Sequence, residues 1–388
     1  MPAPTELLQE RISRVQEMLK NDQNGNPMLV TGNANVGWLT GIPADFQKDA
    51  CLLIRPDKAY FVTDGRYTNR VPEIPGMEAY IWGQEHVHLY PELKNITDGA
   101  KHLVCDTTGI AIDMYHALPA MLELESISAP SGLLDRLRMI KGDLEMKLIR
   151  EAVDIAIGTF NYMVNDWLPK HKDTATDIDF RDELLAEGAR RGSEGASFDP
   201  LVAMDADADT PHPEMDRPGK PLKGEHVMLV DWGFIYKGVC TDMTRMIIIG
   251  YTELPPVFQG MRMLQEKWFD MVAAQLLPGL PASEGGAAYQ IGVKAAGIDT
   301  RFHGAGHGTG GAYVHELPKV SELPDGLDDY GIPFGQAIVL EPGMIVTNEP
   351  GMYEKGVGAY RTENMVLITE DGHEALDRAL PMRPFFVV

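Results

Sequence analysis

The chain has 388 residues, of which 44% are hydrophobic and 23% are charged, and its 57 acidic and 34 basic residues give a formal net charge of −23 at pH 7. A charge of this sign and size disfavours nucleic acids and anionic membrane surfaces as partners, because the summed field repels polyanions. The length suffices for two domains with separate cores, and no apolar run approaches the roughly 18 residues that would cross a membrane.

The first residues, Met1–Glu10, lack both the basic start and the apolar stretch of a signal peptide. The three cysteines are scattered at positions 51, 105 and 240, too few and too far apart for a disulfide framework or a zinc knuckle. We therefore expect a soluble, cytoplasmic protein.

The N-terminal third alternates helical and strand-like patterns. Apolar residues at helical spacing predict a helix over residues 9–20, and short apolar runs predict strands at 27–31, 50–54, 59–63 and 102–105. This pattern indicates an α/β domain over residues 1–138.

A boundary is predicted near residues 137–142, so the second domain covers residues 139–388. Asp143 is placed to cap a long helix that ends near Pro169, and a second amphipathic helix is predicted from Pro256 to about Leu277.

Two aspartates follow or precede apolar runs in this second domain. Asp231 ends the run that starts at Val227, and Asp242 comes eleven residues later, just before the run Met246–Ile249. Two strands with a short connection would bring the two carboxylates side by side, where they would repel each other unless a cation lay between them. The alternative is that each aspartate only ends a strand or caps a turn.

A glycine-rich segment that contains His303, His307 and His315 follows. Glycine lets the backbone approach a ligand closely, and imidazole is both a common metal ligand and a proton carrier. Glu349 and Glu363 lie in strand-like apolar stretches, where a carboxylate without a positive partner is costly to bury.

Together these segments supply four carboxylates and one imidazole, the ligand set of two hard or borderline divalent metals held close together. The sequence therefore predicts a metal-dependent hydrolase. Its proposed ligands are Asp231, Asp242, His307, Glu349 and Glu363.

With these residues and their flanks, nearly all of the chain resembles the metal-dependent proline peptidases of the pita-bread fold, which are Xaa-Pro dipeptidase (prolidase) and aminopeptidase P, with creatinase as a metal-free relative. The resemblance implies a creatinase-like α/β N-terminal domain and an α+β pita-bread catalytic domain. It implies that Asp231 holds the first metal, that Asp242 and Glu363 bridge both, and that His307 and Glu349 complete the second. Residues 36–41 and 63–67 also resemble segments of the family's N-terminal domain, although each could be an ordinary turn-flanked strand.

The resemblance extends to residues around the metals. His212 matches a substrate-binding histidine, His315 matches the histidine that contacts the scissile carbonyl or oxyanion, and His303 stands where a further active-site histidine stands. Arg361 matches an arginine that supports the metal carboxylates or lies close to the proline carboxylate. Tyr353 matches a family tyrosine and is assigned to substrate binding.

Three departures from the family pattern matter. His315 lies eight residues after His307, one more than usual, and Gly310-Gly311 would accommodate the extra residue as a bulge. Thr362 and Asn364 replace the usual neighbours of Glu363. The acidic loop, residues 205–209, favours basic or free-amine substrates, binds cations loosely, or is simply a solvated loop.

The predicted chemistry is hydrolysis of Xaa-Pro bonds by a hydroxide that bridges two metal ions about 3.5–4 Å apart. Glu349 would carry the proton to the leaving amine, and His315 would stabilise the oxyanion. Oxygen-rich ligands favour Mn or Co, with Zn or Fe as alternatives.

Xaa-Pro dipeptidase is the first reading, because the chain is short for aminopeptidase P. The alternatives are aminopeptidase P itself, a non-peptidase hydrolase or lyase of the same fold, and a non-catalytic binding protein. The expected partners are Xaa-Pro dipeptides or short peptides, and the resemblance implies a homodimer.

Overall fold

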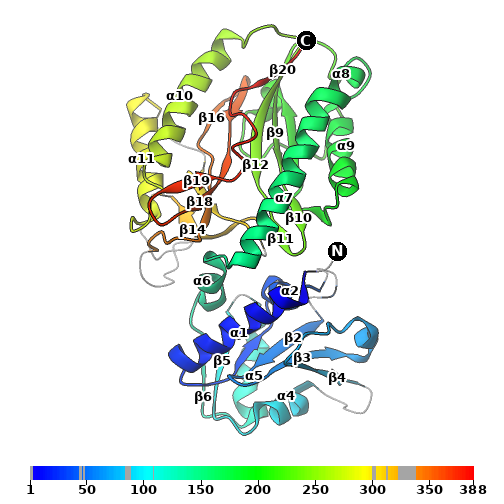
Figure 1. The fold of residues 1–388 in the computed structure, drawn as a ribbon, viewed down its shortest axis with the longest axis vertical. Coiled ribbons are helices and arrows are strands. Elements are labelled where there is room, and N and C mark those ends of the chain that lie inside the picture. Colours follow the sequence, from blue (N-terminus) through cyan, green and yellow to red (C-terminus); the bar gives the residue numbers. More distant parts are fainter. Residues whose placement is uncertain are drawn as a thin grey trace. The chain divides into compact units, whose positions relative to one another are not determined.

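The computed structural model of the chain describes residues 3–42, 46, 49–83, 89–107, 109–298, 303–311, 313–321 and 338–388. Contacts among them form two compact units, one ending at Arg138 and the other comprising Met139–Val388. Each unit has its own hydrophobic core, and Figure 1 shows that each has its own strands and helices. Among the described helices, none combines the length and the apolar composition that a bilayer-spanning helix needs.

The N-terminal unit is built on a six-stranded mixed sheet in the order β4-β3-β2-β1-β5-β6. Its strands are β1 (Met28–Val30), β2 (Ala50–Ile54), β3 (Ala59–Asp64), β4 (Met77–Trp82), β5 (His102–Cys105) and β6 (Ser126–Ser128). Its helices are α1 (Thr5–Asp22), α2 (Asn33–Thr40), the 3-10 turn η1 (Gly65–Arg70), α4 (Leu89–Thr97), α5 (Ile112–Leu122) and α6 (Leu133–Met139).

The predicted helix and the four predicted strands of this unit are confirmed. Helix α1 buries a face that includes Leu8, Ile12, Val15 and Leu19, which recur at helical spacing. Every residue of β1 is buried, as expected for a central strand covered on both faces. Helices α4 and α5 pack their apolar residues on one face of the sheet.

Residues 36–41 do not form the turn-flanked strand that one reading of the sequence allowed. They lie in helix α2 and its C-terminal cap, because Val36 and Leu39 are both buried at helical spacing. The carbonyl of Trp38 accepts a hydrogen bond of 2.9 Å from the buried guanidinium of Arg11, and this bond ties α2 to α1.

The second unit contains twisted strands between two groups of helices (Figure 1). Its helices are α7 (Asp143–Tyr162), the π turn η2 (Met163–Trp167), α8 (Leu168–His171), α9 (Asp177–Arg190), the 3-10 turn η3 (Asp205–Ala208), α10 (Pro256–Ala273) and α11 (Ser283–Ala295). Its strands form sheets in the orders β11-β10-β7, β20-β12-β9-β8, β14-β13-β15-β18-β19 and β16-β17.

The candidate residues lie on or next to the strands of this unit. The first half of the unit contains β7 (Gly195–Ala196), β8 (Leu201–Met204), β9 (His226–Trp232), β10 (Phe234–Tyr236), β11 (Val239–Cys240) and β12 (Met243–Ile249). The second half contains β13 (Gly306–Gly308), β14 (Glu316–Val320), β15 (Ile345–Asn348), β16 (Gly351–Glu354), β17 (Gly358–Arg361), β18 (Asn364–Ile368), β19 (His373–Ala375) and β20 (Phe385–Val387).

The long helix that opens this unit is confirmed, but its predicted cap is wrong. The N-cap is Gly142, whose amide N–H donates to the Glu145 side chain at 3.3 Å, and Asp143 is the first helical residue. The helical run passes through the wider π turn η2 before Pro169 in α8. This widening fits a proline, which lacks an amide hydrogen and clashes with the preceding turn of a regular helix.

The acidic loop is held by contacts within the second unit. Asp205 accepts hydrogen bonds from His226 Nδ1 at 2.7 Å and from the Val227 amide at 2.9 Å. Asp207 forms an ion pair with Lys220 at 2.6 Å, and Asp209 accepts from the Gly356 amide at 2.8 Å. The three carboxylates therefore fasten η3 to its neighbours.

The ion pair between His226 and Asp205 is expected to make a pH-dependent contribution to the free energy of unfolding. The hydrogen bond that His226 donates to Asp205 raises the pKa of His226, against the opposing effects of burial and of Lys220. A raised folded-state pKa stabilises the fold below the unfolded value, and the contribution is lost as pH rises through the folded value. We expect His226→Gln to lower the free energy of unfolding by roughly 0.2–1 kcal/mol at pH 5.5 and by less at pH 8.5.

Denaturant unfolding at the two pH values measures this difference. The side chains of His226 and Asp205 are 22% and 41% exposed, respectively, so solvent screening keeps the contribution of the pair to stability small. The exposed His373 on β19 provides the control, since His373→Gln makes the same replacement where no ion pair is formed with a described carboxylate. An equal loss at both pH values for His226→Gln would contradict the assignment.

Candidate metal centre

Asp231 and Asp242 are brought together by the antiparallel pair β9 and β12. In this pair Asp231 lies opposite Thr244, and Asp242 directly precedes β12. The short hairpin of β10 and β11 forms the connection between them. Both aspartates are buried, with 8% and 4% of their surface exposed.

His307 lies in the short strand β13, between β14 and β15. A Cβ atom at Gly306 would lie 2.0 Å from the Thr347 carbonyl oxygen, so glycine is needed for this approach of the two strands. The Nδ1 atom of His307 is 3.0 Å from the Gly308 carbonyl, to which it donates. Its Nε2 atom therefore faces Glu349 Oε1 at 3.2 Å and Asp242 Oδ2 at 3.5 Å.

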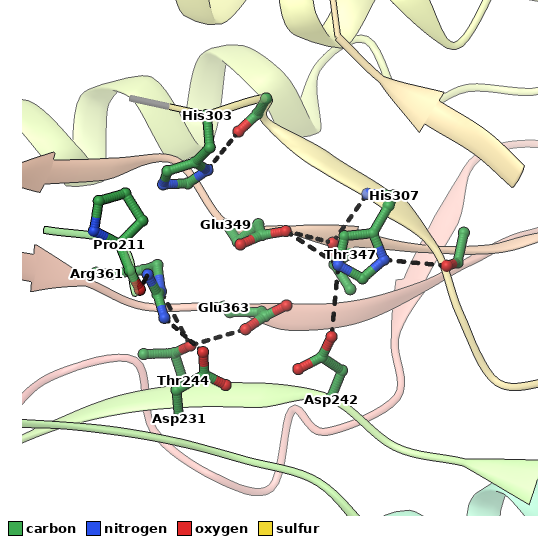
Figure 2. A network of polar contacts seen from close by, with 12 residues as sticks. Pro211, Asp231, Asp242, Thr244, His303, His307, Thr347, Glu349, Arg361 and Glu363 are labelled. Carbon is green, nitrogen blue, oxygen red and sulfur yellow. Dashed lines mark hydrogen bonds and ion pairs between the residues drawn. The ribbon is translucent and has the colours of Figure 1, made fainter. Parts of the chain in front are cut away.

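The two glutamates come from neighbouring strands of the same half. Glu349 directly follows β15, and Glu363 lies between β17 and β18. Glu363 also forms an isolated bridge with Thr244 of β12, which joins the two halves of the unit at the site. Figure 2 shows the four carboxylates and the His307 ring around a common space.

The ligand atoms of these five residues, together with those of His315, fall into three overlapping groups. Within each group they lie within 4.8 Å of one another: Asp231, Asp242 and Glu363; His307, Glu349 and Glu363; and Asp242, His307 and His315. The five residues predicted from the sequence as ligands are thus all in one place.

The electrostatics of the buried carboxylates favour binding of a cation. Burial, and after it the charges of Asp231 and Glu349, raises the pKa of Asp242 well above its usual value. Burial and the charge of Asp242 do the same to the pKa of Glu363. Within the described part of the chain, Asp231 Oδ1 and Glu363 Oε1 are buried without a hydrogen-bond partner. A divalent ion would remove both penalties at once, because it neutralises the carboxylates and satisfies their open oxygens.

A chain of hydrogen bonds lies beside these carboxylates. Arg361 donates from Nη2 to Asp231, from Nε to Thr244 at 3.2 Å and from Nη1 to the Tyr353 hydroxyl at 2.6 Å. The Tyr353 oxygen is 2.8 Å from His303 Nε2, and His303 Nδ1 is 2.8 Å from the Gly304 carbonyl. Both ring nitrogens of His303 therefore have partners, and burial lowers its pKa to about 4.

These carboxylates open into a cavity of about 670 Å³. His212, His303, His315 and Arg361 line it, whereas Tyr353 is not among the lining residues and is 6% exposed. The other lining side chains include Phe198, Asp199, Leu201, Lys319 and Ser321.

His315 reaches the cavity although it comes one residue later than the family motif has it. Its ring lies 4.2 Å from that of His307, between centroids, and burial, His307 and Lys319 lower its pKa to about 4. The expected bulge is not at Gly310-Gly311. The register shift falls between His307 and Gly308, opposite Lys319 and Glu316. His315 lies outside both strands, directly before β14, so strand alternation does not fix its face.

Lys319 was not predicted from the sequence. It lies opposite His307 in the pairing of β13 with β14 and lines the same cavity. The only signal in the sequence is its position four residues after His315, which places it on the strand that follows.

Two family profiles match this chain. That of metallopeptidase family M24 matches residues 147–370, and that of the creatinase/prolidase N-terminal domain matches residues 11–140. An uncharacterized peptidase of Bacillus subtilis, YqhT, is 29% identical over 90% of this chain and 92% of its own length. A putative Xaa-Pro aminopeptidase of Mycoplasma genitalium is 24% identical over 96% and 98%.

Solved structures show the same architecture. The Xaa-Pro dipeptidase from Bacillus anthracis superposes with a TM-score of 0.79 at 25% identity, covering 98% of this chain and 99% of its own. The X-Pro aminopeptidase from Thermotoga maritima gives a TM-score of 0.80 at 20% identity over 97% and 99%, a likeness of fold alone. The predicted fold class, a creatinase-like N-terminal domain followed by a pita-bread domain, is confirmed.

Proposed function

This chain belongs to metallopeptidase family M24, and on that premise we propose that it hydrolyses Xaa-Pro peptide bonds in a reaction that depends on two divalent metal ions. Xaa-Pro dipeptides are the proposed substrates. The observation that carries the proposal is the convergence of four buried carboxylates and one imidazole, two of whose carboxylate oxygens have no partner among the described residues.

Asp231, Asp242, His307, Glu349 and Glu363 would hold the two ions, with Mn or Co preferred and Zn or Fe as alternatives. Bound ions would polarise the peptide carbonyl and bring the pKa of water towards neutrality. The Nδ1–H bond of His307 to a backbone carbonyl supports this role, because it turns Nε2 towards the carboxylates, where a bound ion would take the place of a proton.

The remaining steps are assigned to side chains around the cavity. Glu349 takes a proton from the attacking water and passes it to the proline nitrogen, which has no hydrogen of its own in the peptide bond. His315, neutral above its lowered pKa, donates an N–H hydrogen bond to the developing oxyanion. His212, exposed at the cavity, contacts the substrate.

Arg361, Tyr353 and His303 are assigned a positioning role. The buried guanidinium of Arg361 is occupied by Asp231, Thr244 and Tyr353, which favours support of the carboxylates over binding of the proline carboxylate. Tyr353 links Arg361 to His303, and so it fixes the orientation of that ring.

Lys319 is the proposed partner of the substrate's terminal carboxylate. The described residues that line the cavity include one lysine, Lys319, and one arginine, the buried Arg361. We expect Lys319→Met to raise KM for an Xaa-Pro dipeptide about 10- to 100-fold, since a hydrogen bond to a charged group contributes about 1.5–3 kcal/mol. The value of kcat should change little, because the contact is the same in ground and transition states.

Steady-state kinetics with a dipeptide and with its C-terminal amide measure this effect. The amide should be a poor substrate that Lys319→Met leaves unaffected, and Lys319→Arg should keep most of the affinity. Lys355→Met removes the same charge from an exposed site outside the cavity and is the matched control. Equal KM values for Lys319→Met and Lys355→Met would contradict the assignment.

The proposed function is tested by assaying Xaa-Pro dipeptides beside longer Xaa-Pro peptides, before and after chelation. Dipeptide cleavage that chelator removes and Mn or Co restores is the expected result. Preference for longer peptides would instead indicate an Xaa-Pro aminopeptidase, and activity indifferent to chelator would overturn the mechanism. Metal binding without cleavage of any Xaa-Pro peptide would favour a non-peptidase or a binding member of the fold.

A further inference from the structure

Two buried threonines lie directly behind the glutamates. Thr244 on β12 and Thr347 on β15 are both 0% exposed. Each lies two residues from a proposed ligand on its own chain segment, Asp242 and Glu349 respectively, and residues two apart on a strand share a face. Figure 2 shows both threonines among the ligands.

The hydrogen bonds of Thr244 fix the direction of its hydroxyl proton. Its oxygen accepts from Arg361 Nε at 3.2 Å, and it donates to Glu363 Oε2 at 2.7 Å. A hydroxyl has one proton and a guanidinium can only donate, so the proton must point at the carboxylate.

Thr347 repeats this arrangement on the other glutamate. Its oxygen accepts from the His307 amide at 3.1 Å, and it donates to Glu349 Oε1 at 3.1 Å. It therefore connects the backbone of one proposed ligand to the side chain of another, and the distance between them depends on this hydroxyl.

Two of the carboxylates have one oxygen held by a hydrogen bond and the other oxygen without a partner among the described residues. Glu363 Oε2 is held by Thr244, and Glu363 Oε1 is buried with no hydrogen-bond partner among the described residues. Asp231 shows the same division, with Oδ2 held by Arg361 and Oδ1 open. A fixed oxygen on one side of a carboxylate sets the direction of the other.

We propose that the hydroxyls of Thr244 and Thr347 are positioning groups that orient Glu363 and Glu349 for metal binding, one hydroxyl for each glutamate. This inference rests on the proposed metal-dependent function. It predicts that the hydroxyls, rather than the bulk of the side chains, determine metal affinity.

The test compares valine and serine at each position. Thr→Val keeps the branched shape and removes the hydroxyl, whereas Thr→Ser keeps the hydroxyl. Binding of Mn²⁺ to chelator-treated protein is measured by calorimetry, and thermal unfolding of the metal-free protein is measured in parallel. We expect Thr244→Val and Thr347→Val each to weaken Mn²⁺ binding about 10- to 100-fold, the usual effect of removing a group that orients a ligand. The serine variants should bind nearly as tightly as the unsubstituted protein.

Thr309→Val is the matched control. Thr309 is also 0% exposed and lies two residues from His307, but its hydroxyl has no hydrogen-bond partner among the described residues. It should leave Mn²⁺ affinity unchanged. An equal loss of affinity in Thr309→Val would overturn the inference, because the effect would then follow from any change in packing.

The outcomes separate this inference from the proposed function. Failure of the unsubstituted protein to bind Mn²⁺ would remove the proposed function itself. Tight binding by the unsubstituted and valine proteins alike would overturn only the inference, even if the valine variants melt at lower temperature. If Thr244→Val fails to fold, Thr347→Val is judged by the same criterion.

Discussion

Replacement of Glu349 by glutamine is expected to abolish Xaa-Pro hydrolysis while the fold persists. Burial alone would raise the pKa of Glu349, but the hydrogen bond and the charge of His307 lower it below its usual value. The carboxylate is therefore ionised and can accept a proton, which an amide of the same shape cannot. We expect kcat to fall by about ten-thousandfold, the upper end of what a general base contributes.

Initial rates with an Xaa-Pro dipeptide, together with circular dichroism and thermal unfolding, measure the two parts of this prediction. Glu341→Gln makes the same chemical change at an exposed position outside the cavity and should retain full activity. Activity of Glu349→Gln comparable with that control would contradict the proposed role of Glu349.

Replacement of Arg245 by methionine is expected to destabilise the second unit by about 3–5 kcal/mol, the cost of leaving a buried partner unpaired. Arg245 is 0% exposed and forms an ion pair of 2.9 Å with Asp377, which is also 0% exposed. The same guanidinium donates to the Asn364 side chain and to four backbone carbonyls, those of Thr244, Glu363, Leu380 and Pro381. It therefore holds β12, the loop with Glu363 and the C-terminal segment together.

Denaturant unfolding of the metal-free protein measures this loss, followed by a probe in the second unit, because a chain with two units need not unfold in one step. The exposed pair of Arg262 with Glu266 on α10 supplies the control. Arg262→Met should cost no more than about 0.5 kcal/mol, the usual value of such a helix pair. A loss in Arg245→Met as small as that of the control would refute the structural role of Arg245.

The sequence predicted those parts of the fold that local patterns encode. Helix α1 and strands β1, β2, β3 and β5 followed from apolar periodicity and from short buried runs. Helix α11 was not predicted, because its glycines lower helix propensity. Contact with another element explains one of them: a Cβ atom at Gly292 would lie 2.5 Å from the Trp268 ring on α10. Such a tertiary reason cannot be seen in a local window.

The candidate site was likewise predicted only in part from the sequence. The five proposed ligands were identified because carboxylates and imidazole in apolar or glycine-rich segments are unusual, and because their segments resemble those of the proline peptidases. Thr244, Thr347 and Lys319 were missed. Threonine is common in strands, lysine is usually a solvated surface residue, and a role for either is seen only from its partner across the site. Tyr353 was assigned to substrate binding from the resemblance, and the fold adds that its hydroxyl lies between Arg361 and His303.

Anomalous diffraction from crystals of the chain soaked in Mn²⁺ would locate the proposed ions. Two anomalous peaks are expected about 3.5–4 Å apart, within coordination distance of Asp231, Asp242, His307, Glu349 and Glu363. The absence of any peak among these five side chains, or peaks confined to other parts of the surface, would contradict the proposed metal centre.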